Sequence, residues 1–138
     1  MSEKTDLNAI SHDLHAVRKE KLAQLRAAGW KIAIVSGGFT QAIRPLADFL
    51  GIDRVEAVTL LFHSDGSYAG FDESCPTCKS KGKNVVARRL RAEHRADLVV
   101  MVGDGASDLE VKGDADIVVG FGRYAQRPKV VEIGRAHV

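Results

Sequence analysis

Two aspartates, Asp104 and Asp108, stand four residues apart in a glycine-rich turn that directly follows the apolar run Leu98–Val102. The apolar run predicts a buried strand, and Gly103 and Gly105 indicate that the strand ends there. In open α/β folds, ligands bind beyond the carboxyl ends of the strands, which is where this turn would lie. Mg²⁺ is usually bound by one or two carboxylates together with substrate phosphate. The pattern therefore predicts a magnesium site, and helix capping or a hairpin role for either aspartate is the alternative.

A hydroxyl and two glycines, Ser36-Gly37-Gly38, form a second candidate site at the end of the apolar run of residues 31–36. Glycines let the backbone approach an anion, and the start of a following helix offers N–H groups to it. Ser36 can donate a further hydrogen bond to the same anion. These residues predict a phosphate site, and a tight connection between strand and helix without a ligand is the alternative.

Lys83 opens a predicted basic helix that runs to about His94. A lysine at a helix start, pointing back over the edge of the sheet, can neutralise a phosphoryl group in a transition state. The alternative is a solvated lysine within a basic run. The other members of that run are Lys79, Lys81, Arg88, Arg89, Arg91 and Arg95.

These candidate residues need strands and helices to position them, and the sequence alternates between the two. The alternation predicts a parallel sheet with right-handed crossovers. Asp65-Gly66 predicts a hairpin turn within it. The expected helices cover about residues 14–28, 39–50 and 83–94 with a short one after the acidic turn, and the expected strands cover residues 31–36, 57–62, 67–71, 98–102 and 116–120.

Length and composition favour one globular domain over residues 1–138. No apolar run reaches the roughly 20 residues of a membrane span, so no membrane partner is expected. The basic helix lacks interleaved aromatic residues, so no nucleic-acid partner is expected either. Two cysteines do not make a disulfide framework, and the polar first residues do not resemble a secretion signal. Together these features predict a cytoplasmic protein.

In this order, the hydroxyl-Gly-Gly triplet, the lysine and the acidic turn make the chain resemble the phosphoserine phosphatases of the haloacid dehalogenase superfamily. The resemblance covers about residues 14–130, and one departure is Val58, where the family commonly carries an asparagine. It implies a three-layer, Rossmann-like α/β sandwich with a mainly parallel sheet and a small β-hairpin around residues 57–72. Further matching segments are Leu50-Gly-Ile-Asp53, Gly66-Ser-Tyr-Ala-Gly-Phe-Asp-Glu73, Pro76-Thr77 and Gly120-Phe-Gly122.

The resemblance also implies roles for single residues in the Mg²⁺-dependent hydrolysis of a phosphorylated small molecule such as phosphoserine. Lys83 would neutralise the phosphoryl group, with Lys81 close by in sequence, and Asp104 would ligate Mg²⁺ with support from Asp108. The residues expected to contact phosphate or substrate are Ser36, Gly37, Gly38, Ser107 and Arg127.

The family's first motif, an apolar strand ending in Asp-x-Asp-x-Thr, has no counterpart among the 138 residues. Its first aspartate is the nucleophile, and its second is the general acid and base. We therefore expect a truncated phosphatase domain that binds phosphate and weakly binds Mg²⁺ but is inactive alone. The first strand is central in the family's sheet, so the alternative is a module whose vacant edge pairs with a second copy or with a strand-donating partner.

The spacing of Cys75-Pro-Thr-Cys78 is that of half a zinc site or of a dithiol redox pair. A zinc site needs two more ligands, and His63 is the only histidine nearby in the sequence. Ordinary loop thiols are therefore the preferred interpretation.

Overall fold

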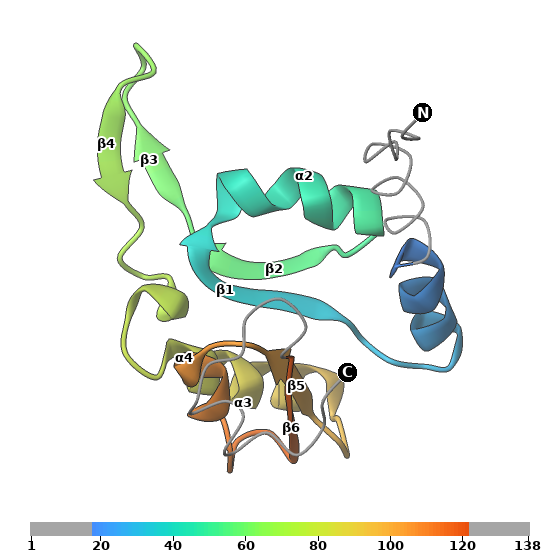
Figure 1. The fold of residues 1–138 in the computed structure, drawn as a ribbon. Coiled ribbons are helices and arrows are strands. Elements are labelled where there is room, and N and C mark those ends of the chain that lie inside the picture. Colours follow the sequence, from blue (N-terminus) through green and yellow to red (C-terminus); the bar gives the residue numbers. More distant parts are fainter. Residues whose placement is uncertain (1–17, 122–138) are drawn as a thin grey trace, which may run out of the picture.

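Residues 18–121 are the part of the chain that the computed structural model describes, and within them helices separate the strands except over residues 54–71, where three strands follow one another (Figure 1). Residues 18–27 are helical, and Gly29 ends that helix with a φ of +93°, as the sequence predicts. The later elements are β1 (Ala33–Phe39), α2 (Thr40–Leu50), β2 (Arg54–Val58), β3 (Leu60–Phe62), β4 (Tyr68–Phe71), the 3₁₀ turn η1 (Pro76–Cys78), α3 (Gly82–His94), β5 (Val100–Gly103), α4 (Ala106–Leu109) and β6 (Ile117–Gly120).

Strands β1 and β2 form a parallel pair, which α2 covers on one side and α3 flanks on the other (Figure 1). The register starts at Ala33 opposite Arg54 and becomes irregular between Val35 and Phe39. Strand β1 thus continues through the glycine pair, and the predicted strand end at residue 36 is wrong. Neither glycine has a positive φ, so the backbone stays extended through them, with an irregular register, before α2 begins at Thr40.

Strands β3 and β4 form the expected hairpin. The carboxylate of Asp65 accepts hydrogen bonds from the backbone N–H of Ser67 at 2.9 Å and from its hydroxyl at 2.6 Å, and Gly66 has a φ of +85°. The single predicted strand over residues 57–62 is divided at Thr59. Its cause is Gln41 of α2, whose side-chain amide bonds both the N–H and the carbonyl of Leu60 at 3.1 and 2.8 Å.

Strands β5 and β6 form a second parallel pair, with Val100 opposite Ile117 and Gly103 opposite Gly120. Its core consists of small side chains, since Ala87, Val111 and Ala115 are buried against it. Within residues 18–121 no hydrogen-bonded ladder joins β1 to β5, so the parallel strands lie in two separate pairs rather than in one continuous sheet.

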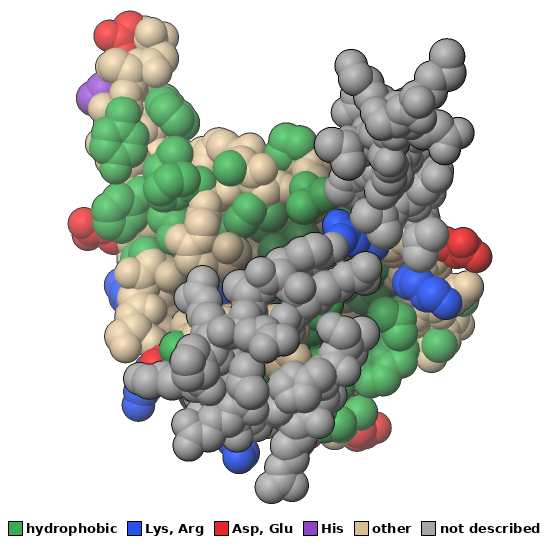
Figure 2. All heavy atoms as spheres, viewed as in Figure 1, with side chains coloured by type: hydrophobic (Ala, Val, Ile, Leu, Met, Phe, Trp, Pro, Cys, Tyr) green, Lys and Arg blue, Asp and Glu red, His purple; other side chains and the backbone are tan. Residues whose placement is uncertain are grey.

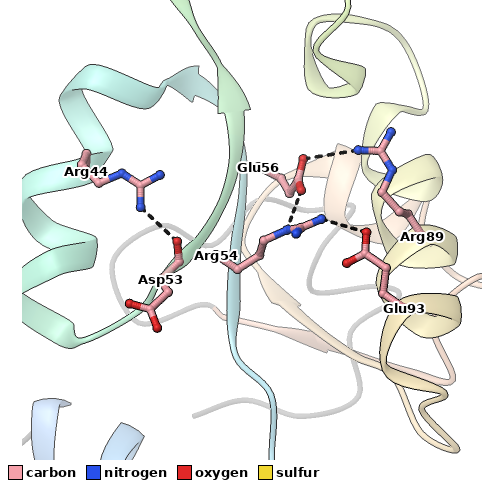
Figure 3. Close-up of polar contacts among 6 residues, drawn as sticks. All are labelled: Arg44, Asp53, Arg54, Glu56, Arg89 and Glu93. Carbon is pink, nitrogen blue, oxygen red and sulfur yellow. Dashed lines mark hydrogen bonds and ion pairs between the residues drawn. The ribbon is translucent and has the colours of Figure 1, made fainter.

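Ion pairs attach α3 to the first parallel pair (Figure 3). The guanidinium of Arg54 in β2 lies 2.7 Å from the Glu56 carboxylate and 3.1 Å from that of Glu93 in α3. Arg89 of α3 reaches Glu56 at 3.8 Å. On the outer side, Arg44 of α2 donates to the carbonyl of Asp53 at 3.0 Å. These contacts fix the helix that carries Lys83 against the strand pair that carries Ser36.

Large apolar side chains remain at the surface of the described part of the chain. Figure 2 shows apolar side chains gathered over the β3–β4 hairpin, where Phe62 is 53% exposed and Tyr68 is 61% exposed. On the β5–β6 pair, Val102 is 58% exposed and Ile117 is 46% exposed. None of the described helices has the length and apolar character needed to cross a membrane.

Candidate functional site

A cavity of about 230 Å³ lies where three predicted motifs meet. The glycine pair contributes Gly37, the start of α3 contributes Lys83, and the acidic turn contributes Ser107. These residues come from segments up to 70 positions apart, and the fold brings them to one place. The remaining lining residues are Thr77, Lys79, Ser80, Lys81, Gly82 and Glu110.

The charge of this cavity favours an anion. Three lysines line it against a single carboxylate, that of Glu110. Lys79 and Lys81 are exposed, and neither ammonium has a hydrogen bond or ion pair with another described residue. The solvated basic run, which the sequence offers as the alternative for Lys83, includes both lysines, and the glycine between Lys81 and Lys83 is the signal against it.

Gly82 sets the position of these lysines because it lies against the 3₁₀ turn η1. A Cβ atom on this residue would stand 1.9 Å from the carbonyl oxygen of Pro76, so only glycine allows α3 to begin here. The preceding residue, Lys81, adopts a left-handed conformation with a φ of +56°. Turn and helix start are therefore in direct backbone contact.

Lys83 reaches across to the acidic turn, where its ammonium forms a 2.5 Å ion pair with Asp108. The side chains are only 16% and 9% exposed. The second oxygen of Asp108 accepts the backbone N–H of Gly105 at 3.0 Å. A Cβ atom at Gly103 would come within 2.2 Å of the carboxylate carbon, so glycine makes room for this aspartate. Asp108 is thus held beneath the turn and bonded on both oxygens.

Asp104 and Ser36 differ from Asp108 because each still has a group available to bind a ligand. Asp104 is exposed at the end of β5 and makes no hydrogen bond or ion pair within residues 18–121. The hydroxyl oxygen of Ser36 accepts the N–H of Gly38 at 3.0 Å, which leaves its proton available to a ligand. Neither residue belongs to the lining of the cavity, and Arg127 lies outside the described residues.

Mg²⁺ fits this donor set only with help from a substrate. Within the described part of the chain, no three histidine, cysteine or acidic side chains are grouped to hold a metal ion. Asp104 is the free carboxylate, because Asp108 is committed to Lys83 and Gly105. Mg²⁺ accepts such a site when phosphate oxygens and waters complete its coordination.

Two further aspartates with a spacing of two residues serve the fold rather than the site. Asp114 accepts hydrogen bonds from Asn84 at 2.8 Å and from Arg88 at 2.9 Å, and these contacts lower its pKa. Asp116 accepts the N–H of Val99 at 2.7 Å, and this bond together with Arg91 lowers its pKa. Both precede β6, and therefore lie at the opposite edge of the β5–β6 pair from Asp104.

Comparison with known proteins places this geometry in context. The model of the haloacid dehalogenase-like hydrolase family matches residues 8–111. Phosphoserine phosphatase from Bos taurus is 38% identical over 114 residues, which are 81% of this chain and 51% of that protein. Phosphoserine phosphatase from Homo sapiens is 34% identical over 122 residues, which are 87% of this chain and 54% of that protein.

Solved structures agree with this comparison. A phosphoserine phosphohydrolase-like protein from Francisella tularensis superposes with a TM-score of 0.73 at 31% identity, and the match covers 87% of this chain and 56% of that chain. A probable phosphoserine phosphatase from Vibrio cholerae gives a TM-score of 0.74 at 30% identity, covering 86% and 36%. The chain spans about half the length of the curated relatives named above.

Proposed function

The chain belongs to the haloacid dehalogenase-like hydrolase family, and on that premise we propose that it is the phosphate-binding part of a phosphomonoester hydrolase of the phosphoserine phosphatase type. The observation that carries this proposal is the cavity at which Gly37, Lys83 and Ser107 meet beside two further lysines. A small cavity lined by three ammonium groups, backbone glycine and hydroxyls suits a phosphate group on a small molecule.

The proposed binding mode divides the work among the lining residues. The backbone at Gly37 and Gly38 and the hydroxyl of Ser36 approach the phosphoryl oxygens, since glycines leave the backbone accessible. Lys83 is already paired with Asp108, so Lys81 supplies the uncompensated positive charge at the start of α3. Ser107 and Arg127 are the proposed contacts to the remainder of a substrate such as phosphoserine.

Asp104 is the proposed ligand for Mg²⁺, and Asp108 acts indirectly by holding Lys83 beside the turn. When bound, the metal ion supplies positive charge that offsets the charge of the phosphoryl group. The residues of the chain then keep their own tasks, which are to bind the phosphate, to orient it and to screen its charge.

Hydrolysis needs a nucleophile that these residues do not supply. The sequence contains no Asp-x-Asp-x-Thr motif. The described acids near the cavity are Asp104, which is the proposed metal ligand, Asp108, which is buried in its ion pair with Lys83, and Glu110. We therefore propose that the chain alone binds phosphomonoesters without turning them over.

Calorimetric titration with phosphoserine, with and without Mg²⁺, tests this function. Lys81→Met removes a free ammonium from the cavity and is expected to weaken binding about tenfold, which corresponds to roughly 1.4 kcal/mol. Lys112→Met is the matched control, because Lys112 is an exposed lysine outside the cavity lining. Equal affinities for both variants would contradict the proposed site. Phosphoserine turnover by the purified chain that Asp104→Ala abolishes would contradict the proposed inactivity.

A second candidate function is that of a strand-accepting module, and the separation of the two parallel pairs favours it. Strand β1 pairs only with β2, and β5 pairs only with β6, among the described strands. Among the described strands, the outer edges of each pair therefore have no ladder partner, and such edges accept strands from other chains. The proposed occupant is an apolar strand from a partner, and self-pairing into a homodimer is the competing outcome.

A further inference from the structure

Two thiols lie in the loop that forms one wall of the cavity. Cys75 precedes the 3₁₀ turn η1 and Cys78 ends it, with Pro76 and Thr77 between them. Both cysteines are free and partly exposed, so solvent reaches them. We propose that Cys75 and Cys78 are a redox-active dithiol that closes to an intrachain disulfide, and that this closure weakens anion binding in the cavity. The second half of this proposal rests on the proposed function.

The backbone places the two cysteines within reach of each other. The N–H of Cys78 donates to the carbonyl of Cys75 at 3.3 Å, which closes a four-residue turn from Cys75 to Cys78. Such a turn holds its end Cα atoms within about 7 Å, and a disulfide needs about 4.4–6.8 Å. Cys75 is the extended N-cap of this turn, with φ −60° and ψ 120°, and Cys78 is the last residue of the turn. The bond can therefore form without a large rearrangement of the backbone.

Little holds the thiols in their reduced arrangement. The sulfur of Cys78 lies 3.7 Å from the carbonyl oxygen of Glu73, which is a weak S–H···O contact. The hydroxyl of Thr77 is buried and has no hydrogen-bond partner among the described residues. Within residues 18–121 no third ligand joins the two sulfurs in a metal-binding group.

The turn between the thiols touches both walls of the anion site. Pro76 and Thr77 lie so close to Gly82 that a Cβ atom there would be 1.9 Å from the Pro76 oxygen and 2.9 Å from the Thr77 Cα. On the other side, the Thr77 carbonyl lies 3.9 Å from the Cβ position of Gly37. The backbone of Gly82 is in direct contact with this turn. A disulfide that draws Cys75 and Cys78 together therefore displaces the start of α3, and with it Lys81 and Lys83.

The chemistry balances with hydrogen peroxide as the oxidant. One thiolate attacks a peroxide oxygen, the O–O bond breaks, and a sulfenic acid forms as one water leaves. The second thiol attacks the sulfenic sulfur, the S–O bond breaks, and a second water leaves. Two thiols thus lose two electrons and two protons, and one peroxide becomes two waters. A dithiol reductant reverses the bond by thiol–disulfide exchange.

The first part of the test follows the bond itself. The full chain is treated with a small excess of hydrogen peroxide, and its free thiols and intact mass are measured. We expect wild type to lose both thiols and two hydrogens, and to regain them with dithiothreitol. Cys75→Ser and Cys78→Ser form no intrachain disulfide. Wild type that keeps both thiols, or that forms only sulfinic acid, overturns the proposal.

The second part measures binding of inorganic phosphate to each form by calorimetry. The oxidised chain is expected to bind about fivefold more weakly than the reduced chain, a modest coupling between two sites. The double variant Cys75→Ser/Cys78→Ser binds like the reduced chain before and after peroxide. Equal affinity of oxidised and reduced wild type overturns the coupling.

Phosphate binding by the reduced chain and zinc binding by the thiols give two further decisive outcomes. If the reduced chain binds no phosphate, both the proposed function and the proposed coupling are contradicted. The thiol and mass measurements then test disulfide formation by itself. If the chain binds one equivalent of zinc that protects both thiols from peroxide, and the double variant does not, the pair is a metal site and the dithiol proposal is overturned.

Discussion

Lys83 and Asp108 show how a charged pair can stabilise the site without being free to bind a ligand. Their ion pair is largely screened from water, and Asp108 is also bonded to the backbone of Gly105. Two charges removed from water depend on each other, since either one alone keeps its desolvation cost and loses its partner. The pair therefore fastens the start of α3 to the turn that carries Asp104.

Asp108→Asn is expected to lower the free energy of unfolding by about 3 kcal/mol, because it leaves the Lys83 ammonium without a countercharge. Urea unfolding at neutral pH measures the change. Arg88→Gln is the control, since Arg88 forms its ion pair with Asp114 while 59% exposed. An exposed pair contributes at most about 1 kcal/mol, so the two variants should differ clearly. Similar losses in both would refute the structural importance of the Lys83–Asp108 pair.

At this scale the sequence located the acidic turn but did not separate the states of its two aspartates. The Gly-Asp-Gly-x-x-Asp pattern correctly predicts a turn after a strand. Asp108 is buried because the missing side chain of Gly103 leaves room for it, and this contact exists only once β5 and α4 are packed. The basic run does not by itself place Lys79 and Lys81 at a ligand site, because the cavity that they line forms only when η1 meets α3.

At the scale of elements, α3 is anchored by aspartates that come after it in the sequence. Asn84 and Arg88 bind Asp114, while Arg91 and the backbone of Val99 bind Asp116. These contacts join the helix to the start of β6, at the edge of the sheet pair opposite to Asp104. They favour the ionised carboxylates and lower both pKa values.

Stability should therefore fall in acid. A carboxyl group whose pKa is lower in the folded state contributes stability above its unfolded pKa of about 3.9, and loses it as the pH falls through the folded pKa. We expect unfolding midpoints in urea to be constant from pH 7 to about pH 5 and to decrease below about pH 4. The variant Asp114→Asn/Asp116→Asn should start lower at pH 7 and decrease less. An equally steep decrease in the variant would mean that other groups cause the loss of stability at low pH. Asp65 and Asp72 are candidates, because their pKa values are also lowered.

Most elements were predictable because their signals are local. The caps at Gly29 and Gly51, the Asp65-Gly66 turn and the apolar run before Gly103 lie within or beside the elements that they define. One error is local, since β1 continues through Gly37 and Gly38 to Phe39, and the other occurs where a distant residue intervenes. Gln41 of α2 bonds the backbone of Leu60, which divides one predicted strand into β2 and β3. Such a side-chain bond carries no periodic pattern in the sequence.

At the scale of the molecule, the two parallel pairs are complete locally but share no ladder in the described part of the chain. The buried apolar residues are few and mostly small, while Val102 and Ile117 remain about half exposed. Burying a valine or isoleucine side chain fully is worth roughly 1.5–3 kcal/mol relative to leaving it exposed. A strand that covers these residues and pairs with an open edge would therefore be stabilised by both apolar contacts and backbone hydrogen bonds.

This arrangement predicts that the chain binds a strand in trans. A second polypeptide carrying an apolar strand that ends in Asp-x-Asp-x-Thr is co-expressed with it, and the mass in solution and the phosphoserine phosphatase activity with Mg²⁺ are measured. We expect a one-to-one complex with an activity that neither chain has alone, because the strand brings a carboxylate nucleophile to the cavity. Proline in the middle of the donor strand should prevent binding, since it removes a ladder hydrogen bond. A complex that forms but stays inactive would support the strand-accepting module and contradict the phosphatase role. A chain that stays monomeric in the presence of the donor would contradict the strand-accepting module, because its open edges would then have no affinity for a strand.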